Sequence, residues 1–141
     1  AAGSVNDLPV TVPVNVAVRL AKTHTCLLVD LDVKRNAVAR VFEIEENNDL
    51  RGGSHQTPVD NLFVWPARNF EKTGHMNLRM LLEGATRKYD YVLIYAPYLT
   101  TLPDRRQVAA CAKQAIAFTG PNGMQLKRLL EVCNCKIVKT A

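Results

Sequence analysis

The sequence has no long run of apolar residues, since each apolar stretch ends after a few positions. A helix that crosses a bilayer needs about 20 predominantly apolar residues, so we expect no membrane span. The pattern of a secretory signal peptide, a charged stretch followed by an apolar one, is also missing. Cys133 and Cys135 are separated by one residue instead of the two of a redox or zinc motif, and no second pair exists. We therefore expect a cytoplasmic protein with structural thiols.

Histidines and cationic side chains are spread along the chain instead of clustered. His24, His55 and His75 fall in different expected elements, so they do not form a metal-binding set. The 18 lysines and arginines exceed the 13 acidic residues and give a net charge of +5. They fall mostly on polar helix faces, whereas a nucleic-acid interface would gather them in a stripe with exposed aromatics. The composition argues against a metal site and against a nucleic-acid partner.

Short apolar runs alternate with amphipathic segments over the 141 residues, a length that fits a single domain, which we place at 1–141. We expect strands over 25–30, 61–66, 91–97, 115–120 and 135–140. We expect helices over 12–22, 36–44, 75–88 and 104–113, and a last helix from Asn122. A polar surface loop is expected over 45–61. Near-continuous apolar strands in this alternation predict an α/β fold. Its sheet is doubly wound and mainly parallel, with helices on both faces.

Ligands of such sheets bind outside the carboxyl ends of the strands. The polar residues just past those ends are Asp30, Asp32, Lys34 and Arg35 after the first strand, Arg68 and Asn69 after the second, and residues 95–101 after the third. We expect any site to lie among these residues.

Two segments of the chain resemble a known family: "CLLVDLDVKRNAVARVF" at 26–42 and "KYDYVLIYAPYLTTLPDRRQVAACAKQAIAFTG" at 88–120. They are similar to P-loop ATPases with a deviant second motif, and most of all to the kinase domain of bacterial tyrosine autokinases of capsular and exopolysaccharide export. Chromosome-partitioning ATPases are the next most similar. In the kinases one strand ends in Asp-x-Asp before arginine-rich residues, and a later strand ends in Asp-x-Pro. The resemblance implies a P-loop NTPase-like three-layer sandwich.

The same resemblance places the phosphate loop of the family on residues 2–11, "AGSVNDLPVT". Its glycines then fall on Asn6 and Leu8, its lysine on Pro9 and its first hydroxyl residue on Val10. Thr11 alone keeps a suitable residue type. A phosphate loop needs glycines that turn backbone N–H groups toward the phosphates, a lysine for their charge and a hydroxyl for Mg²⁺. Proline has neither an N–H nor a charge. The segment therefore lacks most of the residues with which a phosphate loop binds phosphates and Mg²⁺.

Further departures concern the strands. Tyr95 replaces the carboxylate that orients the magnesium water shell in the family. Asp30 and Asp32 remain, and beside Lys34 and Arg35 they are typical of a locally satisfied charge cluster. We interpret the following as remnants of a nucleotide site, without catalytic or metal-binding residues: Thr11, Asp30, Asp32, Lys34, Arg35, Tyr95 and Pro97. The first strand of the family, which precedes the loop, either lies outside residues 1–141 or has been lost.

These departures predict a catalytically inactive P-loop NTPase-like domain, a pseudoenzyme that binds no cofactor. The resemblance implies a scaffolding or regulatory role in exopolysaccharide biosynthesis, at the inner face of the cell membrane. Its expected partner is a membrane chain-length regulator or a second copy of the chain. One alternative is an active autokinase or ATPase that uses ATP and Mg²⁺ with an atypical loop. A second alternative is a nucleic-acid-binding module of the partitioning type.

Overall fold

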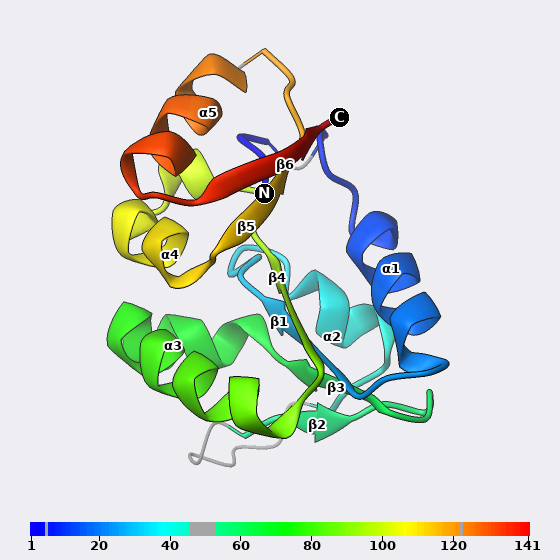
Figure 1. Ribbon diagram of the computed structural model, residues 1–141. Coiled ribbons are helices and arrows are strands. Elements are labelled where there is room, and N and C mark those ends of the chain that lie inside the picture. Colours follow the sequence, from blue (N-terminus) through cyan, green and yellow to red (C-terminus); the bar gives the residue numbers. More distant parts are fainter. Residues whose placement is uncertain (5, 46–52, 122) are drawn as a thin grey trace. The chain divides into compact units, whose positions relative to one another are not determined.

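The computed structural model describes residues 1–4, 6–45, 53–121 and 123–141, and the side chains of residues 70–77 are not described. The chain divides into two compact units (Figure 1). The central unit is Val10–Tyr95, and the terminal unit joins Ala1–Pro9 to Ala96–Ala141. The side chain of His75 and the whole of Asn122, the expected start of the last helix, lie outside the described residues.

A four-stranded sheet forms the middle of the central unit. Its order is β2 (His55–Gln56), β3 (Leu62–Trp65), β1 (Cys26–Asp30) and β4 (Tyr91–Tyr95). β3 and β4 run parallel to β1, whereas β2 is antiparallel to β3. All five residues of β1 are buried, because this strand has a neighbour on each side and helices pack on the sheet. The continuous apolar run that predicted a buried strand here is confirmed.

Three helices belong to the central unit: α1 (Thr11–Ala21), α2 (Ala37–Val41) and α3 (Ala67–Lys88). α1 and α3 both contact β1 and β4, and Figure 1 shows them on opposite sides of the sheet. Small buried residues such as Ala17 and Ala21 form the inner face of α1, which allows a close approach to the strands. The sheet is therefore covered by helices on both faces, and the end of β1 leads into the short helix α2.

The terminal unit contains a parallel pair of strands, β5 (Gln114–Ala117) and β6 (Lys136–Thr140), joined through α5 (Gly123–Val132). A short 3-10 helix (Leu99–Thr101) and α4 (Arg105–Cys111) precede them, and α5 contacts both. Leu126 and Leu130 of α5 are fully buried, as expected for the inner face of an amphipathic helix.

Ala2 forms a strand-type pairing within the terminal unit. It makes a parallel bridge with Phe118 and donates its N–H to the carbonyl oxygen of Ala96 at 3.0 Å. Its own carbonyl oxygen accepts the N–H of Leu99 at 3.1 Å. The first residue of the loop at 2–11 is thus held as a strand residue would be, although no longer strand is formed there by the described residues.

Several predicted boundaries are wrong. The surface loop over 45–61 contains the edge strand β2, and α3 begins at Ala67 instead of residue 75. The strand expected over 91–97 ends at Tyr95, and only this residue of β4 is fully buried, because β4 is an edge of the four-stranded sheet. The mainly parallel α/β fold with its helices is confirmed. Among the described residues, no helix combines the length and the apolar character needed to cross a bilayer.

Candidate functional site

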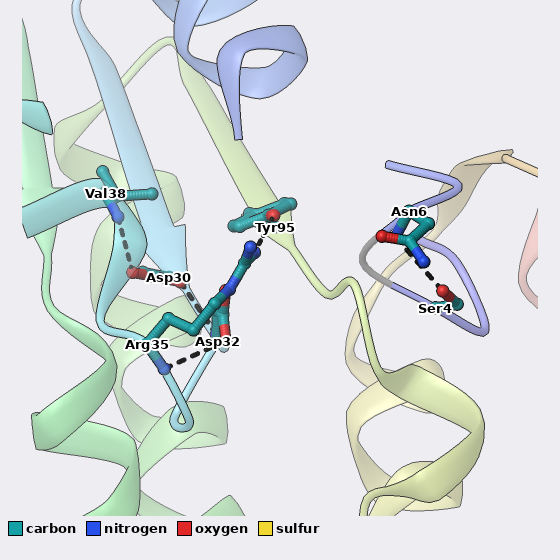
Figure 2. Close-up of polar contacts among 7 residues, drawn as sticks. All are labelled: Ser4, Asn6, Asp30, Asp32, Arg35, Val38 and Tyr95. Carbon is teal, nitrogen blue, oxygen red and sulfur yellow. Dashed lines mark hydrogen bonds and ion pairs between the residues drawn. The ribbon is translucent and has the colours of Figure 1, made fainter. Parts of the chain in front are cut away.

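Asp30 is the last residue of β1, and its side chain is fully buried. Its Oδ1 accepts the backbone N–H of Asp32 at 2.8 Å, and its Oδ2 accepts the backbone N–H of Val38 at 3.0 Å (Figure 2). Val38 lies in the first turn of α2, where N–H groups have no partner within the helix. The Asp30 carboxylate therefore ties the turn after β1 to the start of α2.

Burial dominates the electrostatics of this carboxyl group. It raises the pKa of Asp30 from 3.8 to about 6, and the hydrogen bonds from the N–H groups of Asp32 and Val38 oppose the shift. The negative charge of Asp32 adds to the increase, and the guanidinium of Arg35 counteracts it. Asp30 is thus a carboxylate at neutral pH, but one whose charge is poorly solvated.

Asp32 is also fully buried, and Arg35 neutralises it. The Nε of Arg35 donates to Oδ2 of Asp32 at 2.6 Å, and Nη2 lies 2.5 Å from the same oxygen. The side chain of Arg35 is 39% exposed, so one end of this pair reaches solvent while the carboxylate does not. A buried charge needs such a partner, because an unpaired one is expensive to remove from water.

Tyr95 completes the cluster from the neighbouring strand. It lies opposite Asp30 in the register of β1 and β4, and its hydroxyl accepts a hydrogen bond from Nη2 of Arg35 at 3.1 Å. Only 1% of Tyr95 is exposed, and burial raises its pKa to about 12. The hydroxyl is therefore neutral at pH 7. It cannot supply the negative charge that a carboxylate would bring to this position.

Four of the seven residues interpreted as remnants of a nucleotide site are thus joined by hydrogen bonds: Asp30, Asp32, Arg35 and Tyr95. The other three are Thr11, Lys34 and Pro97. Thr11 is the exposed first residue of α1, Lys34 is exposed in the turn after β1, and Pro97 is buried in the terminal unit. Sequence reasoning missed Val38, because its contribution is a backbone N–H and its side chain gives no sign of it.

The loop at 2–11 is organised by its own short polar side chains and by the buried residues Ala2, Gly3 and Leu8. The hydroxyl of Ser4 accepts the backbone N–H of Asn6 at 3.1 Å (Figure 2), and the carbonyl oxygen of Ser4 accepts the N–H of Asp7 at 3.1 Å. Asp7 is the one charged residue in this stretch of sequence, and it is acidic.

The carboxylate of Asp7 packs against Gly120 in the terminal unit, where any larger residue at position 120 would collide with it. Its Oδ2 is buried and has no hydrogen-bond partner in the described part of the chain. A phosphate-binding loop presents N–H groups and positive charge to its ligand. Here the charged group of the loop is a half-buried carboxylate that packs against Gly120.

No protein-family model matches the chain, and no curated protein matches it. Solved structures do. The septum site-determining protein MinD from Pyrococcus horikoshii, complexed with Mg-ADP, superimposes with a TM-score of 0.74 at 21% identity. The kinase domain of the Escherichia coli tyrosine kinase ETK superimposes with a TM-score of 0.79 at 18% sequence identity. McdA from Cyanothece superimposes with a TM-score of 0.79 at 14% sequence identity. The chain has a P-loop NTPase-like fold.

The resemblance to P-loop NTPase-like tyrosine kinases and partitioning ATPases, first inferred from the motifs, is confirmed by these structures. The matches cover 92% of this chain for MinD and 99% for ETK and McdA. The chain spans 62% of the MinD structure, 64% of the ETK structure and 69% of the McdA structure. At these identities the similarity establishes the P-loop NTPase-like fold alone.

Proposed function

We propose that this chain is a P-loop NTPase-like domain that has lost nucleotide chemistry and acts by binding other proteins. The observation that carries the proposal is the closed cluster at the end of β1. Both oxygens of Asp30 accept backbone N–H groups, and Asp32 is paired with Arg35. A magnesium ion requires oxygen ligands with free lone pairs and nearly octahedral geometry. Both carboxylates are buried and each of their oxygens already accepts a hydrogen bond, which leaves fewer lone pairs for a metal, so the residues present fit a Mg²⁺-nucleotide poorly.

The loop at 2–11 supports the same conclusion from the phosphate side. It has no lysine or arginine, and the carboxylate of Asp7 would repel a phosphate group. Phosphoryl transfer depends almost entirely on positioning and on electrostatic stabilisation of the transferred group. Loss of one preorganised donor costs about 3–4 kcal/mol of transition-state stabilisation in other enzymes. With lysine, hydroxyl and carboxylate all replaced, we expect negligible turnover.

The fold suggests the setting for a binding role. Neighbours of this fold include the ETK kinase domain and the VpsO kinase domain, which covers 99% of this chain with a TM-score of 0.77. With the motif resemblance to kinases of exopolysaccharide export, this supports a scaffolding or regulatory role in that process. We propose a membrane chain-length regulator, or a second copy of the chain, as the partner at the inner face of the membrane.

Phosphate release and self-phosphorylation test the loss of chemistry. The purified chain is incubated with Mg²⁺ and ATP labelled at the γ-phosphate, with Asp30→Asn as a matched variant. We expect the wild type and the variant to give the same background signal. Turnover by the wild type that the Asp30→Asn variant loses would establish the active alternative, an ATPase or autokinase with an atypical loop, and would refute the proposal.

The binding role needs a separate measurement. Sedimentation equilibrium over a range of concentrations reports whether the chain associates with itself. Titration with the cytoplasmic segment of a chain-length regulator reports a hetero-complex. We expect one of these two associations. A chain that stays monomeric and does not bind the regulator segment would contradict the proposed partners.

A further inference from the structure

A cavity of about 510 Å³, widely open to solvent, lies in the central unit, between the chain that leaves α2 and the edge strand β2. Phe42, Ile44 and Pro58 give it apolar walls, and Glu43, Glu45 and His55 add polar ones. Phe42 and Ile44 are half-buried, while both glutamates are exposed. The cavity is separate from the Asp30 cluster in sequence and shares no lining residue with it.

The charge of this cavity is opposite to that of the whole chain. Glu43 and Glu45 are acidic, and no lysine or arginine is among the lining residues that the structure describes. The chain as a whole has a net charge of +5. A basic ligand is therefore repelled by the protein in general and attracted at this place, which favours localised binding.

Glu43 also has an unusual backbone conformation, with φ at 51°. The other non-glycine residues with positive φ among those described are Asn36, Asn61 and Asn134, and asparagine tolerates this region better than other side chains do. The N–H of Ile44 donates to the carbonyl oxygen of Ala39 at 2.9 Å, so Glu43 occupies the helix-ending position at which glycine is usual. The carboxylate of Glu43 is thus carried at a backbone position where glycine is the usual residue.

We propose that this cavity binds an arginine side chain from an extended, basic segment of a partner protein. The aliphatic part of the arginine would pack on Phe42 and Pro58, and its guanidinium would meet the carboxylates of Glu43 and Glu45. Guanidinium offers paired N–H donors that match carboxylate geometry, whereas the ammonium of lysine is a more strongly hydrated point charge. The cavity therefore favours arginine over lysine.

The neighbouring strand suits an extended partner. β2 pairs only with β3 within the described residues, so its other edge faces away from the sheet. An exposed strand edge can pair with an added strand through main-chain hydrogen bonds, while side-chain pockets provide specificity. His55 and Gln56 belong to both β2 and the cavity lining, so a segment paired along β2 would run beside the cavity.

Nuclear magnetic resonance tests this assignment with the ¹⁵N-labelled chain and the peptide acetyl-Ala-Arg-Ala-Arg-Ala-amide at low salt. We expect saturable shifts of the backbone amides of Phe42, Ile44, His55 and Gln56. The lysine analogue of the peptide should bind more weakly. The double variant Glu43→Gln and Glu45→Gln should lose affinity by about tenfold or more, the value of one charge-assisted hydrogen bond.

Two further variants separate binding from folding. Glu83→Gln removes an exposed glutamate of α3 that pairs with Arg79 outside the cavity, so it should leave the affinity unchanged. Glu43→Gly should weaken binding while raising the melting temperature, because it removes the carboxylate and the backbone strain together. The assignment is overturned by the absence of saturable shifts, by shifts confined to other faces, or by a double variant that binds as well as the wild type.

This inference names the partner chemistry of the proposed binding role and rests on that role. The two can fail separately, because phosphate release is measured on the same samples. Peptide binding by a chain that also hydrolyses ATP would refute the loss of chemistry and leave the cavity assignment standing. A chain that neither hydrolyses ATP nor binds the peptide would refute the cavity assignment alone. Self-association that the double glutamine variant abolishes would identify a second copy as the occupant and overturn the assignment to another protein.

Discussion

Arg35 donates to the hydroxyl of Tyr95 at 3.1 Å while its Nε donates to Asp32 at 2.6 Å. One guanidinium thus joins a carboxylate that follows β1 to the tyrosine that ends β4. The consequence is a closed charge cluster at the carboxyl ends of these parallel strands, which is where open α/β sheets generally bind their ligands.

Tyr95→Phe should lower the free energy of unfolding by about 0.5–1.5 kcal/mol, because the ring can stay packed while Arg35 loses a hydrogen-bond acceptor. Urea denaturation followed by circular dichroism measures the change. Tyr91→Phe is the matched control, since Tyr91 lies on the same strand and is 41% exposed. Equal stability of the Tyr95→Phe variant and the wild type would contradict the role given to this hydroxyl.

The stability of the chain should fall as the pH rises from about 4 to about 6. The folded-state pKa of Asp30 is raised to about 6 from 3.8, so the folded state binds the proton more tightly than the unfolded state in this range. One pKa unit corresponds to about 1.4 kcal/mol, so the full penalty, present above pH 6, is about 3 kcal/mol.

Denaturation curves recorded between pH 4.5 and pH 7 measure how the free energy of unfolding depends on pH, because this interval contains the pKa of Asp30, which is about 6. In the Asp30→Asn variant the decrease over this interval should be much smaller, because the titrating group is gone. An equally steep decrease in wild type and variant would show that another group is responsible.

Asp90 and Thr25 form a reciprocal pair that fixes the starts of β1 and β4. Oδ2 of Asp90 accepts the N–H of Thr25 at 2.8 Å and its hydroxyl at 3.0 Å, and Thr25 Oγ1 accepts the N–H of Asp90 at 3.1 Å. The backbone hydrogen bond from Thr25 lowers the pKa of Asp90. Its stabilisation is therefore present above the unfolded-state pKa and is lost as the pH falls through the folded-state value.

Asp90→Ala should therefore lower the melting temperature at pH 7, as differential scanning calorimetry will show. Asp60→Ala, at another exposed aspartate of the central unit, is the control and should have little effect. Similar melting temperatures for the two variants would argue against the pair.

Glu43→Gly should raise the free energy of unfolding by about 0.5–1 kcal/mol. Left-handed backbone costs most residues about 1–2 kcal/mol, and the greater freedom of glycine in the unfolded chain offsets part of the gain. The same substitution at Glu83 should have the opposite sign and lower stability by about 1 kcal/mol, because position 83 lies inside α3. Chemical denaturation of both variants gives the sign of the change in the free energy of unfolding. A Glu43→Gly variant less stable than the wild type would refute backbone strain at this position.

Much of the fold was predictable because buried parallel strands are continuous apolar runs, as "CLLVD" of β1 illustrates. The start of α3 was not. The helix was expected from residue 75, directly after Gly74, which has low helix propensity, yet it runs from Ala67. β2 is two residues long, too short for a period-2 pattern to emerge from polar surroundings.

The candidate site was predictable in part for a different reason. Asp30, Asp32 and Tyr95 follow or end neighbouring parallel strands, so their proximity follows from the topology. The direction of the backbone N–H of Val38 and the bond between Arg35 and Tyr95 depend on the path of the chain after β1. Residue identities do not encode that path. The backbone strain at Glu43 is hidden from the sequence in the same way.

Isothermal titration calorimetry with Mg²⁺ and ATP tests the central claim most directly, with the P. horikoshii MinD protein, which was solved with Mg-ADP, as the positive control. We predict heats no larger than those of dilution, because Asp30 and Asp32 are hydrogen-bonded within the chain and the loop at 2–11 contains Asp7 and no lysine or arginine. A saturable isotherm with a micromolar Kd, accompanied by phosphate release, would contradict the account.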